Sequence, residues 1–204
     1  MTAAVGFSLH TGWAAAVVVV RDRHRIEVIS RRRLELLPES AIPRFVYHRA
    51  AEICTESSLN EATALVESAR AIVNQAAHKA IKELLQSIRI EVCAAGIPSS
   101  AKQADDGTSM PLEKILESHA LIHAAEGRLF RRAVVDACER CGVPADLIPA
   151  RDVWRQVAEL CGMEEGQFRR EVDAIGKQIG PPWTADQKLA TAAGLTAAAM
   201  LGAR

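Results

Sequence analysis

Hydrophobic and polar positions along this chain follow strand-like spacing in some segments and helix-like spacing in others. Five segments carry a strand-like pattern: Ala3–Leu9, Trp13–Val20, Arg25–Leu37, Ser87–Gly96 and Ala145–Pro149. Within the second of these, residues 17–20 are four consecutive valines, which is typical of a strand covered on both faces. The first three segments follow one another closely, so they predict an antiparallel meander.

Other segments place apolar residues at helical spacing. They cover about 60–85, 111–142, 153–161, 164–177 and 184–201, with a short helix or loop at about 44–54. The last of them begins at a capping box, Thr184 with Gln187 three residues later. The predicted order is therefore three strands, helix, strand, helix, strand and helices. It predicts an α/β fold in which helices cover both faces of a mixed five-stranded sheet.

The segment 111–142 is the longest helical pattern, and it carries polar groups on its apolar stripe. At 100° per residue, His119, His123 and Glu126 fall within about 60° of one another in the middle of that stripe. Two imidazoles and a carboxylate at i, i+4 and i+7 can surround one Zn²⁺, Mn²⁺ or Fe²⁺, with Asp186 or His10 as a fourth ligand. The alternative is a structural trio whose members are buried and hydrogen-bonded.

Composition narrows the class of protein. The chain has 204 residues, which predicts a single domain over 1–204, and its 25 basic residues balance 25 acidic ones. The apolar run Ala14–Val20 is too short to span a bilayer, so no membrane partner is expected. Five scattered cysteines predict reduced thiols and a cytoplasmic protein, in which Cys138 and Cys141 serve packing. A homo-oligomer is compatible with this composition.

Three stretches resemble the ribonuclease-H-like superfamily, nearest to the RuvC-type Holliday-junction resolvases. The segment Val5–Ala14 (VGFSLHTGWA) is similar to their first strand and turn, and Gly142–Val153 to their fifth strand and the following helix start. Asp186, on an alanine-rich helix, resembles the acid of their C-terminal helix. The resemblance implies a nucleic-acid partner, branched or single-stranded, and a divalent metal cofactor (Mg²⁺, Mn²⁺ or Zn²⁺) held by carboxylates.

The sequence departs from this family at the expected acids. The first-strand aspartate of the family falls at Ser8, a neutral and weak metal ligand. Glu91 is a candidate for the fourth-strand acid and Glu61 for the first-helix acid, whereas Asp186 alone has a matching setting. A standard two-metal nuclease site is therefore not expected. Proton transfer between Ser8 and His10 at the end of the first strand is an alternative chemistry, and plain turn structure is the other reading.

Basic residues supply candidates for a phosphate backbone. Arg31, Arg32 and Arg33 follow one another on a predicted strand, and Lys188 lies beside Asp186. The arginines also fit a solvated strand edge that discourages aggregation. The first hairpin resembles the phosphate loop of actin-like ATPases and sugar kinases too, although the chain is too short for their duplicated domain.

Three functions remain open at this point. The leading one is a divergent resolvase-like protein that binds or processes nucleic acid or a phosphorylated ligand. Its predicted catalytic residues are Asp186, Glu126, Ser8 and His10, and its predicted metal ligands are His119, His123, Glu126 and Asp186. The second is a metal-dependent hydrolase or metal-binding protein that uses the helical histidines. The third is a non-catalytic interaction module. Coordinates that relate Asp186 to the histidines would separate them best.

Overall fold

The sheet of this protein is built from the five predicted strands. The structure is a computed structural model that describes residues 3–22, 25–38, 42–100 and 110–202, without the side chain of Glu56. The strands are β1 (Ala3–His10), β2 (Trp13–Asp22), β3 (Arg25–Glu35), β4 (Val92–Ser99) and β5 (Ala145–Pro149). Their order across the sheet is β3-β2-β1-β4-β5. The first three strands pair antiparallel, whereas β1–β4 and β4–β5 are parallel, which confirms the mixed sheet.

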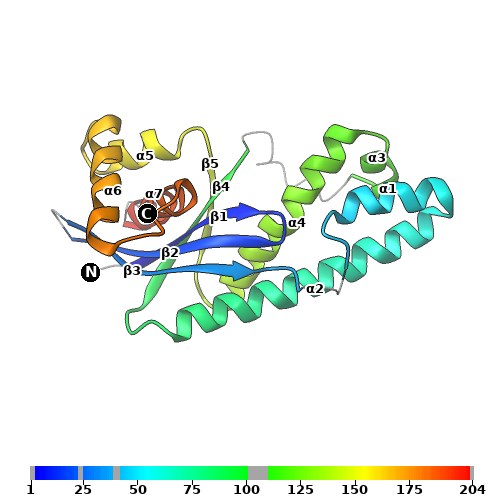
Figure 1. Cartoon of the computed structure of the whole chain (residues 1–204), viewed down its shortest axis with the longest axis horizontal. Helices are drawn as coiled ribbons and strands as arrows, with labels where there is room; N and C mark the ends of the chain where they lie inside the picture. The colour runs from blue at the N-terminus through cyan, green and yellow to red at the C-terminus, as the bar shows by residue number, and fades with distance from the viewer. Residues whose placement is uncertain (1–2, 23–24, 39–41, 101–109, 203–204) are drawn as a thin grey trace.

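Helices cover both faces of this sheet (Figure 1). Within the described residues they are α1 (Val46–Glu56), α2 (Leu59–Gln86), α3 (Leu112–Leu116), α4 (His119–Arg140), α5 (Val153–Leu160), α6 (Glu165–Ile179) and α7 (Ala185–Gly202). No helix in this described part of the chain is both long and apolar enough to cross a bilayer. The α/β architecture expected from the hydrophobic pattern is therefore confirmed.

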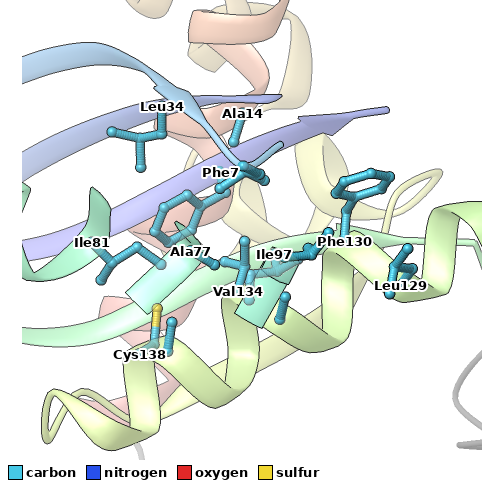
Figure 2. Packing of buried hydrophobic residues seen from close by; sticks show 14 of the residues in the cluster. Phe7, Ala14, Leu34, Ala77, Ile81, Ile97, Leu129, Phe130, Val134 and Cys138 are labelled. Carbon is cyan, nitrogen blue, oxygen red and sulfur yellow. The ribbon is translucent and has the colours of Figure 1, made fainter. Parts of the chain in front are cut away.

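The alternation of side chains along the strands separates two cores. Phe7 and Val18 belong to the core beneath α1, α2 and α4, while Val17 and Val19 belong to the core beneath α5, α6 and α7. Figure 2 shows the first core, in which Phe7 of β1 lies among side chains of α2 and α4. Because successive strand residues face opposite sides, the four valines of β2 serve both cores.

Small residues bring α7 into direct contact with the sheet. A methyl group added at Gly6 would overlap the carbonyl oxygen of Ala190, and one added at Gly96 would overlap that of Ala193. Gly194 lies against the backbone of β1 in turn. The alanine-rich composition of α7 therefore has a structural cause: its backbone packs on β1 and β4 at a distance that larger side chains would prevent.

Two predicted elements need correction. The predicted helix 111–142 is two helices, because Ser118 takes an extended conformation and becomes the N-cap residue of α4. The predicted strand Ser87–Gly96 is instead Val92–Ser99, since the chain stays in a turn after α2 until residue 91. The longest helix is α2, with 28 residues, and not the segment that carries His119.

Candidate functional site

Asp186 lies where β1 ends, as the resemblance predicted. The Ser8 hydroxyl donates a hydrogen bond to Asp186 Oδ1 over 2.9 Å, and His10 Nε2 lies 2.7 Å from the same oxygen. The close packing of α7 on β1 explains this meeting, because it fixes the first turn of α7 beside the last residues of β1. Ser8 is buried, whereas His10 and Asp186 reach solvent.

A row of planar side chains leads away from Asp186. The His10 ring stacks on the indole of Trp13, with centroids 4.2 Å apart and planes 7° apart. The Arg33 guanidinium lies 3.9 Å from the centroid of the Trp13 ring and also pairs with Glu35 at 2.6 Å. Cation–π contact and stacking hold this row in place. Trp13 was not among the predicted site residues. Its position directly after the turn that follows the first strand could have indicated that it lies beside His10.

The other candidate acids do not join Asp186. Val92 of β4 pairs with Ala3, at the start of β1, so Glu91 lies at the end of the sheet opposite to Ser8. Glu61 lies in the first turn of α2, where it accepts a hydrogen bond from Ser57 and its backbone N–H donates to Ser58. Figure 1 shows that α2 begins away from the sheet. Neither Glu91 nor the start of α2 that carries Glu61 therefore lies beside Asp186.

A site for two metal ions needs several carboxylates close together, and the described side chains around Ser8 do not form such a cluster. The contacts of Asp186 within the described residues are a serine hydroxyl and an imidazole. Residues 92–99 of β4, VCAAGIPS, contribute no acid to this end of the sheet. The side chains described here therefore do not fit a two-metal nuclease centre.

Glu126 is buried and has a defined structural task. Its Oε1 accepts hydrogen bonds from the backbone N–H groups of Tyr47 (2.7 Å) and His48 (3.3 Å), in the first turn of α1. The N-cap residue of α1, Phe45, supplies no side-chain cap. A carboxylate from α4 therefore caps α1, where the positive end of the helix dipole favours an anion. The second oxygen, Oε2, is buried with no hydrogen-bond partner among the described residues.

The two histidines of α4 meet a third one from α1. One nitrogen from each of His48, His119 and His123 lies within 4.8 Å of the other two. His119 and His123 are exposed rather than buried in the apolar stripe, because the first turn of α4 reaches past the sheet toward α1. Sequence reasoning missed His48, since it lies far from His119 in the chain and has no spacing motif. The other two predicted metal ligands each contact a different histidine. Glu126 Oε1 lies 3.3 Å from His48 Nδ1, and Asp186 Oδ1 lies 2.7 Å from His10 Nε2.

A hollow of about 300 Å³ separates the Asp186 group from the histidines. It is lined by His10 and Thr11 at the end of β1, by Phe45 before α1, and by several residues of α4 that include His123, Glu126 and Arg131. The Arg131 guanidinium lies over Gly127, 3.1 Å from where a Cβ would stand, so a side chain at this position would require the guanidinium to shift by a few tenths of an ångström. Desolvation by burial, with a contribution from Arg128, lowers the pKa of Arg131.

The basic candidates differ in their surroundings. Arg31 donates to the carbonyl groups of Ile179, Gly180, Pro181 and Pro182, and Lys188 pairs with Asp173 at 2.8 Å. Arg32 and Arg33 are exposed. Contact of these four residues with nucleic acid stays a prediction.

The cysteine pair is not set up for redox chemistry. Cys138 is fully buried in the core beneath α2 and α4, and burial raises the pKa of its thiol to about 12. Burial also raises the pKa of the Cys141 thiol. Thiolates are the reactive species, so both shifts disfavour reaction at neutral pH.

Comparison with known proteins points to one fold. The sequence matches no protein-family profile and no functionally curated protein. Among solved structures it is similar to RuvC of Thermus thermophilus in complex with a Holliday junction substrate, with a TM-score of 0.55 and 14% identity over 100% of this chain and 96% of that one. A second Thermus thermophilus RuvC structure gives a TM-score of 0.54 and 14% identity over 99% and 96%. Together with the strand order and the helices on both faces, this shows that the chain has the ribonuclease-H-like fold of the RuvC resolvases.

Proposed function

We propose that this protein binds branched or single-stranded nucleic acid at the end of the sheet where β1 stops and α1 begins. The observation that carries the proposal is an exposed aromatic ring set among arginines at that place. Phe45 is 51% exposed, although large apolar side chains are usually buried. It lines two neighbouring hollows, one with Arg44 and Arg49 and the other with His10 and Arg131.

This combination suits a flexible nucleic acid strand. An aromatic side chain offers a stacking surface to an unpaired base, and guanidinium groups bind phosphate oxygens. The row of Arg33, Trp13 and His10 reaches the same hollow from the edge of the sheet, because His10 belongs to both. The similarity of the fold to a RuvC structure that holds a Holliday junction supports the choice of a branched substrate.

We expect the protein to bind nucleic acid but not to cleave it by the two-metal mechanism. Ser8 stands where the RuvC-type family carries its first-strand aspartate, and its hydroxyl hydrogen-bonds Asp186. Two Mg²⁺ ions need several shared carboxylate oxygens, and among the described residues Asp186 is the one carboxylate seen in contact with Ser8.

The test is a comparison of an immobile four-way junction, a single strand and a linear duplex of the same sequence, measured by fluorescence anisotropy over a salt series. We expect the junction and the single strand to bind at least about tenfold more tightly than the duplex, because a single strand exposes whole bases to stacking and an open junction exposes the faces of the base pairs at its crossover. Phe45→Ala is expected to weaken binding by about tenfold or more. Leu160→Ala removes a similarly exposed apolar side chain on α5 and is the matched control.

Arginine variants test the charge contribution. Arg44→Ala should lower the slope of log affinity against log salt concentration by about one unit. Arg169→Ala, on α6 and paired with Glu165, should leave that slope unchanged. Labelled junction should stay intact in Mg²⁺ or Mn²⁺. The proposal fails if none of the three nucleic acids binds or if Phe45→Ala binds as tightly as the unaltered protein.

A further inference from the structure

The three histidines form a compact group at the junction of two helices. His48 is the third residue of α1, while His119 and His123 are one turn apart at the start of α4. Their ring centroids lie 5.5 Å (His48–His119), 4.8 Å (His48–His123) and 4.4 Å (His119–His123) apart. The packing of α1 against α4 and the capping of α1 by Glu126 bring the three rings to this place.

The orientation of the rings suits a shared metal ion. The three interplanar angles are 84°, 71° and 90°, so no two rings stack face to face. Nitrogens around a tetrahedral zinc ion, at about 2.0–2.1 Å from the metal, are about 3.3 Å apart. The nitrogens here lie within 4.8 Å of one another. Closing this difference takes small side-chain rotations, and His119 and His123 are exposed and able to make them.

Glu126 adds the partner that a ligating histidine commonly has. Its Oε1 lies 3.3 Å from His48 Nδ1, and the same oxygen is fixed by two backbone N–H groups. A proton on Nδ1 that is donated to this carboxylate leaves the lone pair of Nε2 available to a metal. This is the carboxylate–histidine–metal arrangement, in which the carboxylate orients the ring and raises its basicity.

The burial of the Glu126 carboxylate also favours a metal ion near His48. The residue is only 4% exposed, and its Oε2 has no hydrogen-bond partner among the described residues. A buried carboxylate is costly unless a positive charge lies close by. A dication bound to the far side of His48 would supply such a charge.

We propose that His48, His119 and His123 bind one divalent transition-metal ion of the Zn²⁺ class, with Glu126 as the residue that positions His48. Imidazole nitrogens suit Zn²⁺, Co²⁺, Ni²⁺ and Cu²⁺, whereas Mg²⁺ prefers oxygen ligands. Three protein ligands leave a fourth position, which solvent reaches through the exposed sides of His119 and His123. The site differs from the predicted set, because His48 replaces Glu126 and Asp186 as a direct ligand.

The experiment uses untagged, chelator-treated full-length protein titrated with Co²⁺ and followed by visible absorption. We expect one Co²⁺ per chain with the intense bands of a tetrahedral site, and loss of these bands when Zn²⁺ is added. His48→Ala, His119→Ala and His123→Ala should each weaken binding by at least about tenfold. His78→Ala removes a half-buried histidine from the middle of α2 and is the matched control, expected to bind as before.

Glu126→Gln tests the positioning role. The amide keeps the size of the side chain, so the fold should persist by circular dichroism, while Co²⁺ affinity should fall by about 10- to 100-fold. The competing explanation is that His48 simply carries a proton and pairs with Glu126. In that case no tetrahedral bands appear, or the three alanine variants bind Co²⁺ like the unaltered protein, and either result overturns the proposal.

The Co²⁺ titration tests the metal site separately from the proposed binding of nucleic acid. Phe45→Ala should bind Co²⁺ normally, because Phe45 contacts His48 only edge-on, with ring centroids 5.7 Å apart. A protein that binds Co²⁺ but no junction contradicts the proposed function alone. A protein that binds junction but shows no Co²⁺ bands contradicts the metal site alone.

Discussion

At the scale of single residues, the end of β1 shows how a neutral side chain can serve as the partner of a carboxylate. Ser8 Oγ and His10 Nε2 both contact Asp186 Oδ1, at 2.9 and 2.7 Å. The hydroxyl at this position donates a hydrogen bond to the carboxylate and carries no charge of its own. An aspartate there would put two like charges at the same distance, which is stable only with a proton or a metal between them.

Ser8→Asp turns this difference into a prediction. Ser8 is buried, so the new carboxylate should lower the free energy of unfolding by about 3 kcal/mol in chelator. Addition of Mg²⁺ or Mn²⁺ should recover part of that loss. Thermal unfolding with and without each ion measures both effects.

Ser8→Asn is the control for Ser8→Asp, because an asparagine side chain has nearly the same shape as aspartate but carries no charge. Its melting temperature should not respond to Mg²⁺. If Ser8→Asp melts like Ser8→Asn in chelator, the two side chains at positions 8 and 186 are not in the contact described here.

At the scale of elements, the contact of α7 with β1 and β4 decides where Asp186 lies. The contact depends on glycines, since a Cβ at Gly6 would overlap a backbone carbonyl of α7. A backbone group cannot rotate away as a side chain can. The helix would have to move as a whole, and Asp186 would move with it.

Gly6→Ala is therefore expected to destabilise the protein by about 3 kcal/mol or more, measured by urea unfolding. Gly166→Ala provides the opposite case on α6, where an added Cβ meets only the Arg170 guanidinium at 3.5 Å. That exposed helical site should gain roughly 0.5–1 kcal/mol. Equal stabilities for the two alanine variants would mean that α7 does not pack on β1 as closely as described.

At the scale of the whole molecule, Arg31 of the edge strand β3 forms hydrogen bonds with the connection between α6 and α7. Its guanidinium donates to four carbonyl oxygens of residues 179–182. Arg32, the next residue along β3, faces the opposite side of the sheet and is exposed. The run of three arginines thus combines a structural residue with solvent-facing ones.

Arg31→Ala should lower the free energy of unfolding by about 3 kcal/mol, because several charge-assisted hydrogen bonds are lost and carbonyl groups are left without them. Arg32→Ala should change it by less than about 0.5 kcal/mol. Chemical denaturation gives both values. A large loss for Arg32→Ala with none for Arg31→Ala would reverse this assignment.

The sequence alone predicted much of this architecture. The order of strand-like and helix-like patterns gave the mixed sheet, and the short motif around Ser8 together with Asp186 led to the ribonuclease-H-like fold. The strand and helix predictions succeeded because they depend on local periodicity, whereas the pairing of Ser8 with Asp186, 178 positions apart, came from the resemblance to the family. The break at Ser118 was missed, since a serine inside a strong apolar pattern is also compatible with an unbroken helix.

The composition of the candidate sites was decided by tertiary structure. Spacing along a helix can show that His119 and His123 share a face, but not that His48 of α1 completes the group. Likewise, the pattern placed Glu126 on a buried stripe, while its role as the cap of α1 depends on how α1 packs against α4. Periodicity is a property of one segment, whereas a binding site is a set of contacts between segments, and only the packed chain determines which segments meet.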